Sequence, residues 1–162
     1  SGFHINMSVK GPGENRMHHM MGGILRHVSD MTRFLNPSPQ SYSRLGVCKA
    51  PKYISWSNNN RSMLIRIPAA AGEYRRVELR SPDCTANPYL AFALLIWAGL
   101  DGIQNEIDLP EKANVNLYTA EPRDIGDMET LPLSLGAAIK RAEESEFIRA
   151  HLPESLIACY KN

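Results

Sequence analysis

The chain has 162 residues, which is the size of one ordinary domain. Hydrophobic residues make up 43% and charged residues 22%, and these globular values exclude disorder as the main state. Lys and Arg number 18 against 17 Asp and Glu, so the formal net charge is +1. A general nucleic-acid or anionic-membrane binder needs a basic excess, so neither partner is expected.

The cysteines and the start of the chain bear on its cellular context. Cys48, Cys84 and Cys159 are odd in number and lie far apart, so we predict no disulfide framework or zinc ribbon and expect a cytoplasmic protein. The longest apolar run, residues 90–100, is too short to cross a bilayer. The chain begins with Ser1 inside a predicted strand, which suggests a piece of a larger protein.

The first half of the chain predicts strands around one long helix. Period-two alternation predicts a strand over 3–9, with His4, Asn6 and Ser8 on its polar side. Helical spacing follows over 17–35 and is ended by Asn36-Pro37, and residues 38–52 are expected to be a loop. Further strands are predicted over 53–57, 62–67 and 74–80, joined by hairpin or short connecting turns.

The second half is predicted to be helical. Asn87 can cap a helix over 88–105, and Pro88 suits its first turn. A looser stretch covers 107–131, and the tail over 134–160 predicts two or three short helices broken at Pro153. No repeat or linker interrupts the chain. The fold class is therefore α+β, with antiparallel strands packed against helices.

A charged strand face is the first candidate site. Period two places Arg76, Glu78 and Arg80 on one face of their strand. This face is either solvated surface or a site in which the carboxylate binds a hard metal ion and the arginines bind phosphate or carboxylate oxygens. Arg61 and Arg66 flank the preceding strand and add to a cluster suited to multiply charged anions, for which surface solvation remains the alternative.

His4 lies on the second polar strand face. A single histidine on a strand is commonly a structural, hydrogen-bonded residue. If Glu78 is brought alongside, the pair could instead bind a metal ion.

Several motifs, in order, resemble the C-terminal half of glutamine synthetase. They comprise residues 1–8, 36–45, 60–68, 76–83, 87–93 and 98–103. The resemblance weakens after about Tyr118. It implies that residues 1–162 are the C-terminal segment of a glutamine synthetase catalytic domain, with the N-terminal domain and upstream catalytic strands absent.

The resemblance also implies a reaction. The family joins ammonia to glutamate with ATP through a γ-glutamyl phosphate intermediate, uses Mg²⁺ or Mn²⁺, and assembles as homo-oligomeric rings. The segment alone is expected to be inactive.

Residue roles follow from the matching motifs. His4 and Glu78 resemble metal ligands, and Arg61 and Arg80 resemble catalytic residues. The glutamate-binding residues implied are Arg44, Arg61 and Arg80, and the nucleotide- and phosphate-binding residues are Asn6, Met7, Ser8, Arg61, Arg66 and Arg76.

Three positions depart from the family pattern or carry a lineage-specific feature. Asn6 replaces a second histidine, and Lys49 replaces the glutamate of a flap before Ala50-Pro51. Tyr118 stands where some bacterial members are adenylylated. Two alternatives stay open: a ligase that γ-glutamylates an amine, and a non-catalytic relative. Lys49 favours the non-catalytic relative, whereas His4, Glu78 and the arginines oppose it.

Overall fold

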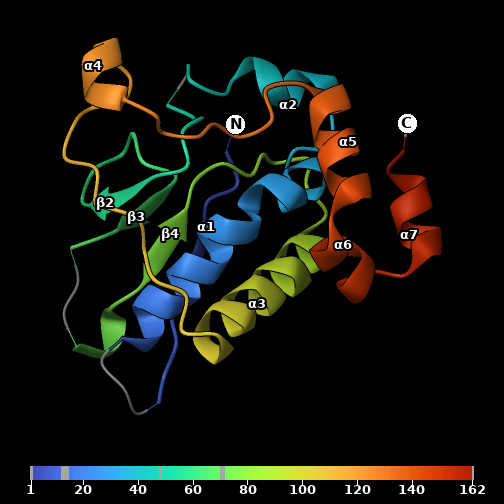
Figure 1. The fold of residues 1–162 in the computed structure, drawn as a ribbon, viewed down its shortest axis with the longest axis horizontal. Coiled ribbons are helices and arrows are strands. Elements are labelled where there is room, and N and C mark those ends of the chain that lie inside the picture. Colours follow the sequence, from blue (N-terminus) through green and yellow to red (C-terminus); the bar gives the residue numbers. More distant parts are fainter. Residues whose placement is uncertain (1, 12–14, 48, 70–71, 162) are drawn as a thin grey trace.

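A small sheet packs beside two long helices in the computed structural model, which describes residues 2–11, 15–47, 49–69 and 72–161 (Figure 1). The helices are α1 (Arg16–Leu35), α2 (Pro39–Ser43), α3 (Pro88–Gln104), α4 (Pro122–Ile125), α5 (Leu135–Glu144), α6 (Glu146–His151) and α7 (Glu154–Cys159). The strands are β1 (Ile5–Met7), β2 (Trp56–Asn58), β3 (Ile65–Ile67) and β4 (Val77–Leu79), with a 3-10 turn η1 (Gly72–Tyr74) before the last.

The sheet has one apolar and one polar face. Its strand order is β1-β4-β3-β2, so the strand that carries Glu78 is central. Ile5, Leu79 and Ile65 lie in one row across the sheet and are buried. Asn6, Glu78 and Arg66 form the next row and therefore point to the opposite face. The apolar face joins the hydrophobic core, which leaves the polar face for a site.

Helices α1 and α3 run side by side across the molecule, and α1 lies between the sheet and α3 (Figure 1). Glycines allow their backbones to approach closely: a Cβ on Gly102 would lie 2.0 Å from the His19 carbonyl oxygen. The start of α3 is fixed as predicted, because Asn87 Oδ1 accepts hydrogen bonds from the backbone N–H groups of Tyr89 and Leu90. Within the described part of the chain, no helix is long and apolar enough to span a membrane.

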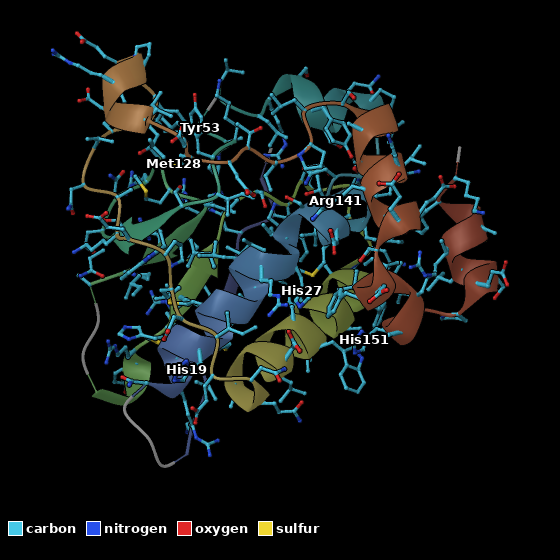
Figure 2. All side chains as sticks on the ribbon, in the orientation of Figure 1. His19, His27, Tyr53, Met128, Arg141 and His151 are labelled. Atoms are coloured by element: carbon cyan, nitrogen blue, oxygen red, sulfur yellow. The ribbon has the colours of Figure 1, made fainter. Side chains whose placement is uncertain are left out.

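Polar contacts anchor the C-terminal helices to α1. Asp30 accepts hydrogen bonds from Arg141 Nε at 2.6 Å and from the Ser145 hydroxyl at 2.7 Å. His27 pairs with Asp101 at 2.7 Å and stacks on Phe147, with 4.0 Å between ring centroids. Figure 2 shows His27 on α1, with Arg141 and His151 on the C-terminal helices beside it.

The α+β class and the long helices are confirmed, whereas the strands are shorter than predicted. Burial follows the predicted alternation over 3–9, but residues 62–65 and 77–80 are buried throughout. Each strand keeps only the three residues that have a hydrogen-bonded neighbour. The antiparallel expectation holds for β1–β4 and β3–β4 and is wrong for β2–β3, which pair in parallel. A parallel pair requires the chain to return from the end of β2 to the level where β2 begins. Because each strand has only three residues, the segment 59–64 is long enough for this return.

Two short helices were not predicted. The stretch 38–52, expected to be a loop, contains α2, in which Ser38 and Ser41 form a reciprocal cap. Helix α4 begins at Pro122 within the looser stretch over 107–131. The tail forms α5, α6 and α7 as predicted, and Pro153 separates the last two.

Candidate functional site

The Glu78 carboxylate is the centre of the polar sheet face. Its side chain is buried, and its neighbours are His4 just before β1, Arg66 on β3 and Arg80 just after β4. Oε1 lies 3.1 Å from His4 Nδ1, whereas Oε2 lies 2.8 Å from Arg66 Nε and 3.1 Å from an Arg80 terminal nitrogen. The Arg80 contact is a hydrogen bond, while the Arg66 contact is an ion pair without hydrogen-bond alignment. The two oxygens therefore serve different partners.

A hollow of about 520 Å³ opens over this carboxylate. Its lining residues are Gly2, His4, Arg44, Lys49, Ala50, Arg61, Arg66, Glu78 and Arg80. Five of these side chains are cationic and one is a carboxylate, so the wall carries a surplus of positive charge. Fixed cations around a small hollow favour a multiply charged anion.

Arg44 is held at the rim by groups from two other segments. One terminal nitrogen donates hydrogen bonds to Asn36 Oδ1 and to the Ser81 carbonyl oxygen. Burial lowers the pKa of Arg44 from its ordinary value, and the charge of Asp83 opposes that shift. An arginine side chain keeps its charge at neutral pH, and the two hydrogen bonds fix the direction of this guanidinium.

His4 is poised as a neutral imidazole. Burial is the largest effect that lowers its pKa below the ordinary value of 6.5, and the nearby Arg80 charge lowers it further. Glu78 opposes both effects, and the net direction is downward. A neutral imidazole with a free ring nitrogen is the form that binds metal ions.

His4 and Glu78 fit two neighbouring ligands of a divalent cation. Perpendicular bonds of about 2.1 Å in an octahedral ion place two ligand atoms about 3.0 Å apart. His4 Nδ1 and Glu78 Oε1 are 3.1 Å apart. Among the described residues no group of three or more His, Cys, Asp or Glu side chains could hold an ion. The metal-binding role of His4 and Glu78 therefore stays a prediction that rests on this pair.

The structure separates the predicted residues into two groups. His4, Glu78, Arg44, Arg61, Arg66 and Arg80 line the hollow. Asn6 and Arg76, predicted to contact nucleotide or phosphate, do not line it: Arg76 Nε donates to Asn6 Oδ1 at 3.3 Å on the exposed part of the face. Neither Met7 nor Ser8 lines it, because Met7 packs against the hydrophobic core and Ser8 is exposed to solvent. The roles of both groups remain predictions.

Lys49, the departure in the flap, also lines the hollow. Its backbone φ is +64°, in the left-handed region that non-glycine residues rarely adopt. The neighbouring Cys48 lies outside the described residues.

The sequence did not predict the residues that fix Arg44 and Arg61 by hydrogen bonds. Asn36 was interpreted only as a helix stop, and Ser81 had no predicted role. Tyr118 was singled out for another reason, yet its hydroxyl donates a hydrogen bond to the Arg61 carbonyl oxygen. No local pattern could reveal these contacts, because Ser81 and Tyr118 lie far along the chain from their arginines and Asn36 reaches Arg44 only across the turn that α2 makes.

Comparison with known proteins gives a consistent result. A family model described as "Glutamine synthetase, catalytic domain" matches residues 1–162. The chain is 41% identical to a glutamine synthetase of Methanosarcina mazei over 176 residues, covering 99% of this chain and 39% of that protein. It is also 41% identical to that of Pyrococcus furiosus, covering 100% and 39%, and 40% identical to that of Thermotoga maritima, covering 96% and 39%.

Solved structures agree with the sequence relatives. One described as "GmaS/ADP complex-Conformation 1" superposes with a TM-score of 0.83 at 31% identity, covering 99% of this chain and 40% of that chain. Another, "Apo GmaS without ligand", superposes with a TM-score of 0.78 at 33% identity, covering 94% and 35%. The chain thus spans about two fifths of the length of the curated relatives it matches.

Proposed function

This chain belongs to the glutamine synthetase catalytic-domain family, and we propose that its hollow is the phosphoryl- and carboxylate-binding part of an ATP-dependent glutamate–ammonia ligase site. Residues 1–162 would be the C-terminal segment of the catalytic domain in a ring-forming protein. The observation that carries the proposal is the convergence of Arg44, Arg61, Arg66 and Arg80 with the His4–Glu78 pair on one hollow. The ADP in the description of a similar structure supports a nucleotide ligand.

The arginines suit the two stages of amide formation. In the first, a γ-carboxylate oxygen of glutamate attacks the terminal phosphorus of ATP, and ADP leaves. In the second, ammonia attacks the carbonyl carbon of the acyl phosphate, phosphate leaves, and nitrogen loses a proton. Negative charge is spread over the phosphoryl oxygens and the leaving ADP in the first stage and grows on the departing phosphate in the second, and cations such as Arg61 and Arg80 stabilise it.

The remaining groups orient the reactants. Arg44, fixed by Asn36 and Ser81, has the geometry to bind a substrate carboxylate. His4 and Glu78 would hold Mg²⁺ or Mn²⁺, which supplies charge neutralisation for the phosphate oxygens. Arg66 and Arg80 hold Glu78 Oε2, and this leaves Oε1 directed toward His4.

A non-catalytic role is the second candidate, and Lys49 favours it. Loss of a proton from nitrogen needs a base, and an ammonium side chain at the hollow repels ammonium and cannot accept a proton. Glu78 is the carboxylate in the lining, and it is already paired with two arginines. In this reading the chain binds nucleotide or phosphate without completing ligation. A ligase for an amine acceptor faces the same difficulty.

Calorimetry with ADP tests the leading proposal. We expect the 162-residue chain to bind ADP more tightly with Mg²⁺ or Mn²⁺ present, because the ion joins the nucleotide to His4 and Glu78. His4→Ala is expected to abolish the metal dependence. His151→Ala, whose ring lies against Trp97 away from the hollow, is the matched control and should behave as wild type. No ADP binding by folded protein with either ion would contradict the proposal.

Lys49→Glu distinguishes the ligase from the non-catalytic binding role when it is made in the full-length protein. A large gain in ligation rate would indicate an impaired ligase that lacks its carboxylate. An unchanged rate would favour a binding role. Lys49→Gln distinguishes the new carboxylate from mere loss of the positive charge.

A further inference from the structure

We propose that Tyr118 is a positioning residue for the arginine pair Arg61 and Arg80, and that its hydroxyl sets the affinity of the hollow for phosphoryl groups. The inference rests on the proposed function, because it assumes that these arginines bind an anion. It concerns the hydrogen bond that the unmodified phenol makes, and the arginines that this bond holds in place.

One backbone atom joins the three residues. The Arg61 carbonyl oxygen accepts a hydrogen bond from the Tyr118 hydroxyl at 3.2 Å and another from Arg80 Nε at 3.1 Å. A carbonyl oxygen has two lone pairs, so the two donors occupy both. The direction of the Arg80 guanidinium and the turn that carries Arg61 are therefore tied to the same point.

Tyr118 is suited to remain a donor. Burial raises the pKa of its phenol above the ordinary value of 10.0, and the charge of Arg80 and a hydrogen bond with that side chain oppose the shift. The hydroxyl therefore keeps its proton at the neutral pH at which the arginines and a phosphate carry their charges. A deprotonated oxygen would instead repel the Arg61 carbonyl.

The segment that carries Tyr118 is tied to the turn that carries Arg61. Asn60 Nδ2 donates to the Val115 carbonyl oxygen at 2.9 Å, and the Leu117 N–H donates to Ser62 Oγ at 2.9 Å. The Ser62 hydroxyl donates in turn to Asn60 Oδ1 at 2.8 Å. These bonds form a connected network, so the segment and the turn move together.

Backbone anchoring matters most for Arg61. Its side chain is exposed, and no ion pair among the described residues includes its guanidinium. Before an anion binds, the turn therefore limits where this guanidinium can go. Loosening the turn adds conformations that must be given up on binding, and affinity falls.

Tyr118→Phe tests the inference, because it removes one oxygen and keeps the ring. Pyrophosphate is titrated calorimetrically into the 162-residue chain. We expect about two- to tenfold weaker binding, the effect of one hydrogen bond, with a melting temperature lowered by no more than a few degrees. Tyr89→Phe, at a side chain that is 83% exposed, is the matched control and should bind as wild type does.

A second readout follows the arginine itself. In ¹⁵N-detected spectra, the Arg80 Nε–H of Tyr118→Phe should exchange with water faster than in wild type, while the amides of α1 keep their protection. A merely structural effect of the ring would not move this signal. Equal pyrophosphate affinity in the variant, or weaker binding with an unchanged Arg80 signal, overturns the inference. Failure of wild type to bind pyrophosphate at all would instead contradict the proposed function.

Discussion

Arg66 stands opposite Glu78 across strands β3 and β4, with its Nε 2.8 Å from the carboxylate. Arg80, just after the end of β4, pairs with the same oxygen. Both arginines line the hollow, and both are at least partly buried, so the fold must supply a counter-charge. Glu78 is therefore a structural counter-ion as well as the predicted metal ligand.

Glu78→Gln is expected to lower the free energy of unfolding by about 3 kcal/mol, because it leaves two guanidinium groups without their shared negative charge. Urea denaturation at neutral pH measures the change. Glu144→Gln is the matched control, since Glu144 forms an exposed pair with Lys140 at 3.9 Å, and a change under about 0.5 kcal/mol is expected there. Equal effects at the two positions would show that burial of the Glu78 network carries no stability.

Gly102→Ala is expected to destabilise the chain by about 3 kcal/mol, because α1 and α3 would have to separate. The new Cβ would lie 2.0 Å from the His19 carbonyl oxygen and 2.7 Å from the Gly23 backbone nitrogen, and backbone atoms cannot rotate away. Thermal and urea denaturation measure the loss.

Gly136→Ala is the control for that substitution. Gly136 lies in α5, and a Cβ there would meet no atom within 4 Å. Alanine is the better helix former, so this variant should gain stability by up to about 1 kcal/mol. A gain at Gly102 as well would mean that the two helices are not in close contact.

The parts of the fold that local patterns determine were predictable. Asn87 caps α3 as expected, because a side-chain acceptor beside the first turn is a local property. Period two correctly placed Glu78 and Arg80 on one strand face. Period two could not say that β2 would pair in parallel with β3, because strand pairing depends on how residues 59–64 connect in space.

In the candidate site, too, some residues could be predicted from the sequence and others could not. His4 and Glu78 were predicted as partners through the family resemblance, and they lie 3.1 Å apart. The supports of the arginines were not predictable, because Asn36 reaches Arg44, and Tyr118 reaches Arg61, only after the chain has folded. Sequence periodicity identifies the side chains that share one face. It does not identify the residues whose hydrogen bonds fix those side chains in place.

Asp83→Asn is expected to lower the free energy of unfolding by about 1–3 kcal/mol at pH 7. Burial by itself would raise the pKa of Asp83, but hydrogen bonds from Ser41 and Thr85 and the charge of Arg44 lower it below the ordinary value of 3.8. The folded state thus favours the carboxylate. Its contribution is present above pH 3.8 and is lost as the pH falls through the folded-state pKa.

The pH dependence of this variant provides the check. The stability difference between wild type and Asp83→Asn should be constant near neutral pH and shrink below pH 3.8, as the wild-type carboxyl becomes protonated. Asp127→Asn, at an exposed position, should show no such convergence. A constant gap down to pH 2 would mean that the hydrogen bonds do not favour the charged form.

Tyr42→Phe is expected to leave stability unchanged or to raise it by about 1 kcal/mol, unlike most substitutions at buried positions. The Tyr42 side chain is buried, and within the described residues its hydroxyl has no hydrogen-bond partner. Removing an unpaired buried hydroxyl also removes its desolvation penalty. Urea denaturation at pH 7 measures the change.

The same variant has a predicted signature at alkaline pH. Burial, reinforced by Asp83 and opposed by Arg33, raises the pKa of Tyr42 to about 12 from an ordinary value of 10.0. The unfolded chain therefore releases the phenolic proton first, and wild type loses stability as the pH rises from 10.0 to about 12. Tyr42→Phe should lose less over that window, whereas Tyr89→Phe, at an exposed ring, should follow wild type. Parallel curves for wild type and Tyr42→Phe would show that this hydroxyl ionises as easily in the folded protein as in water.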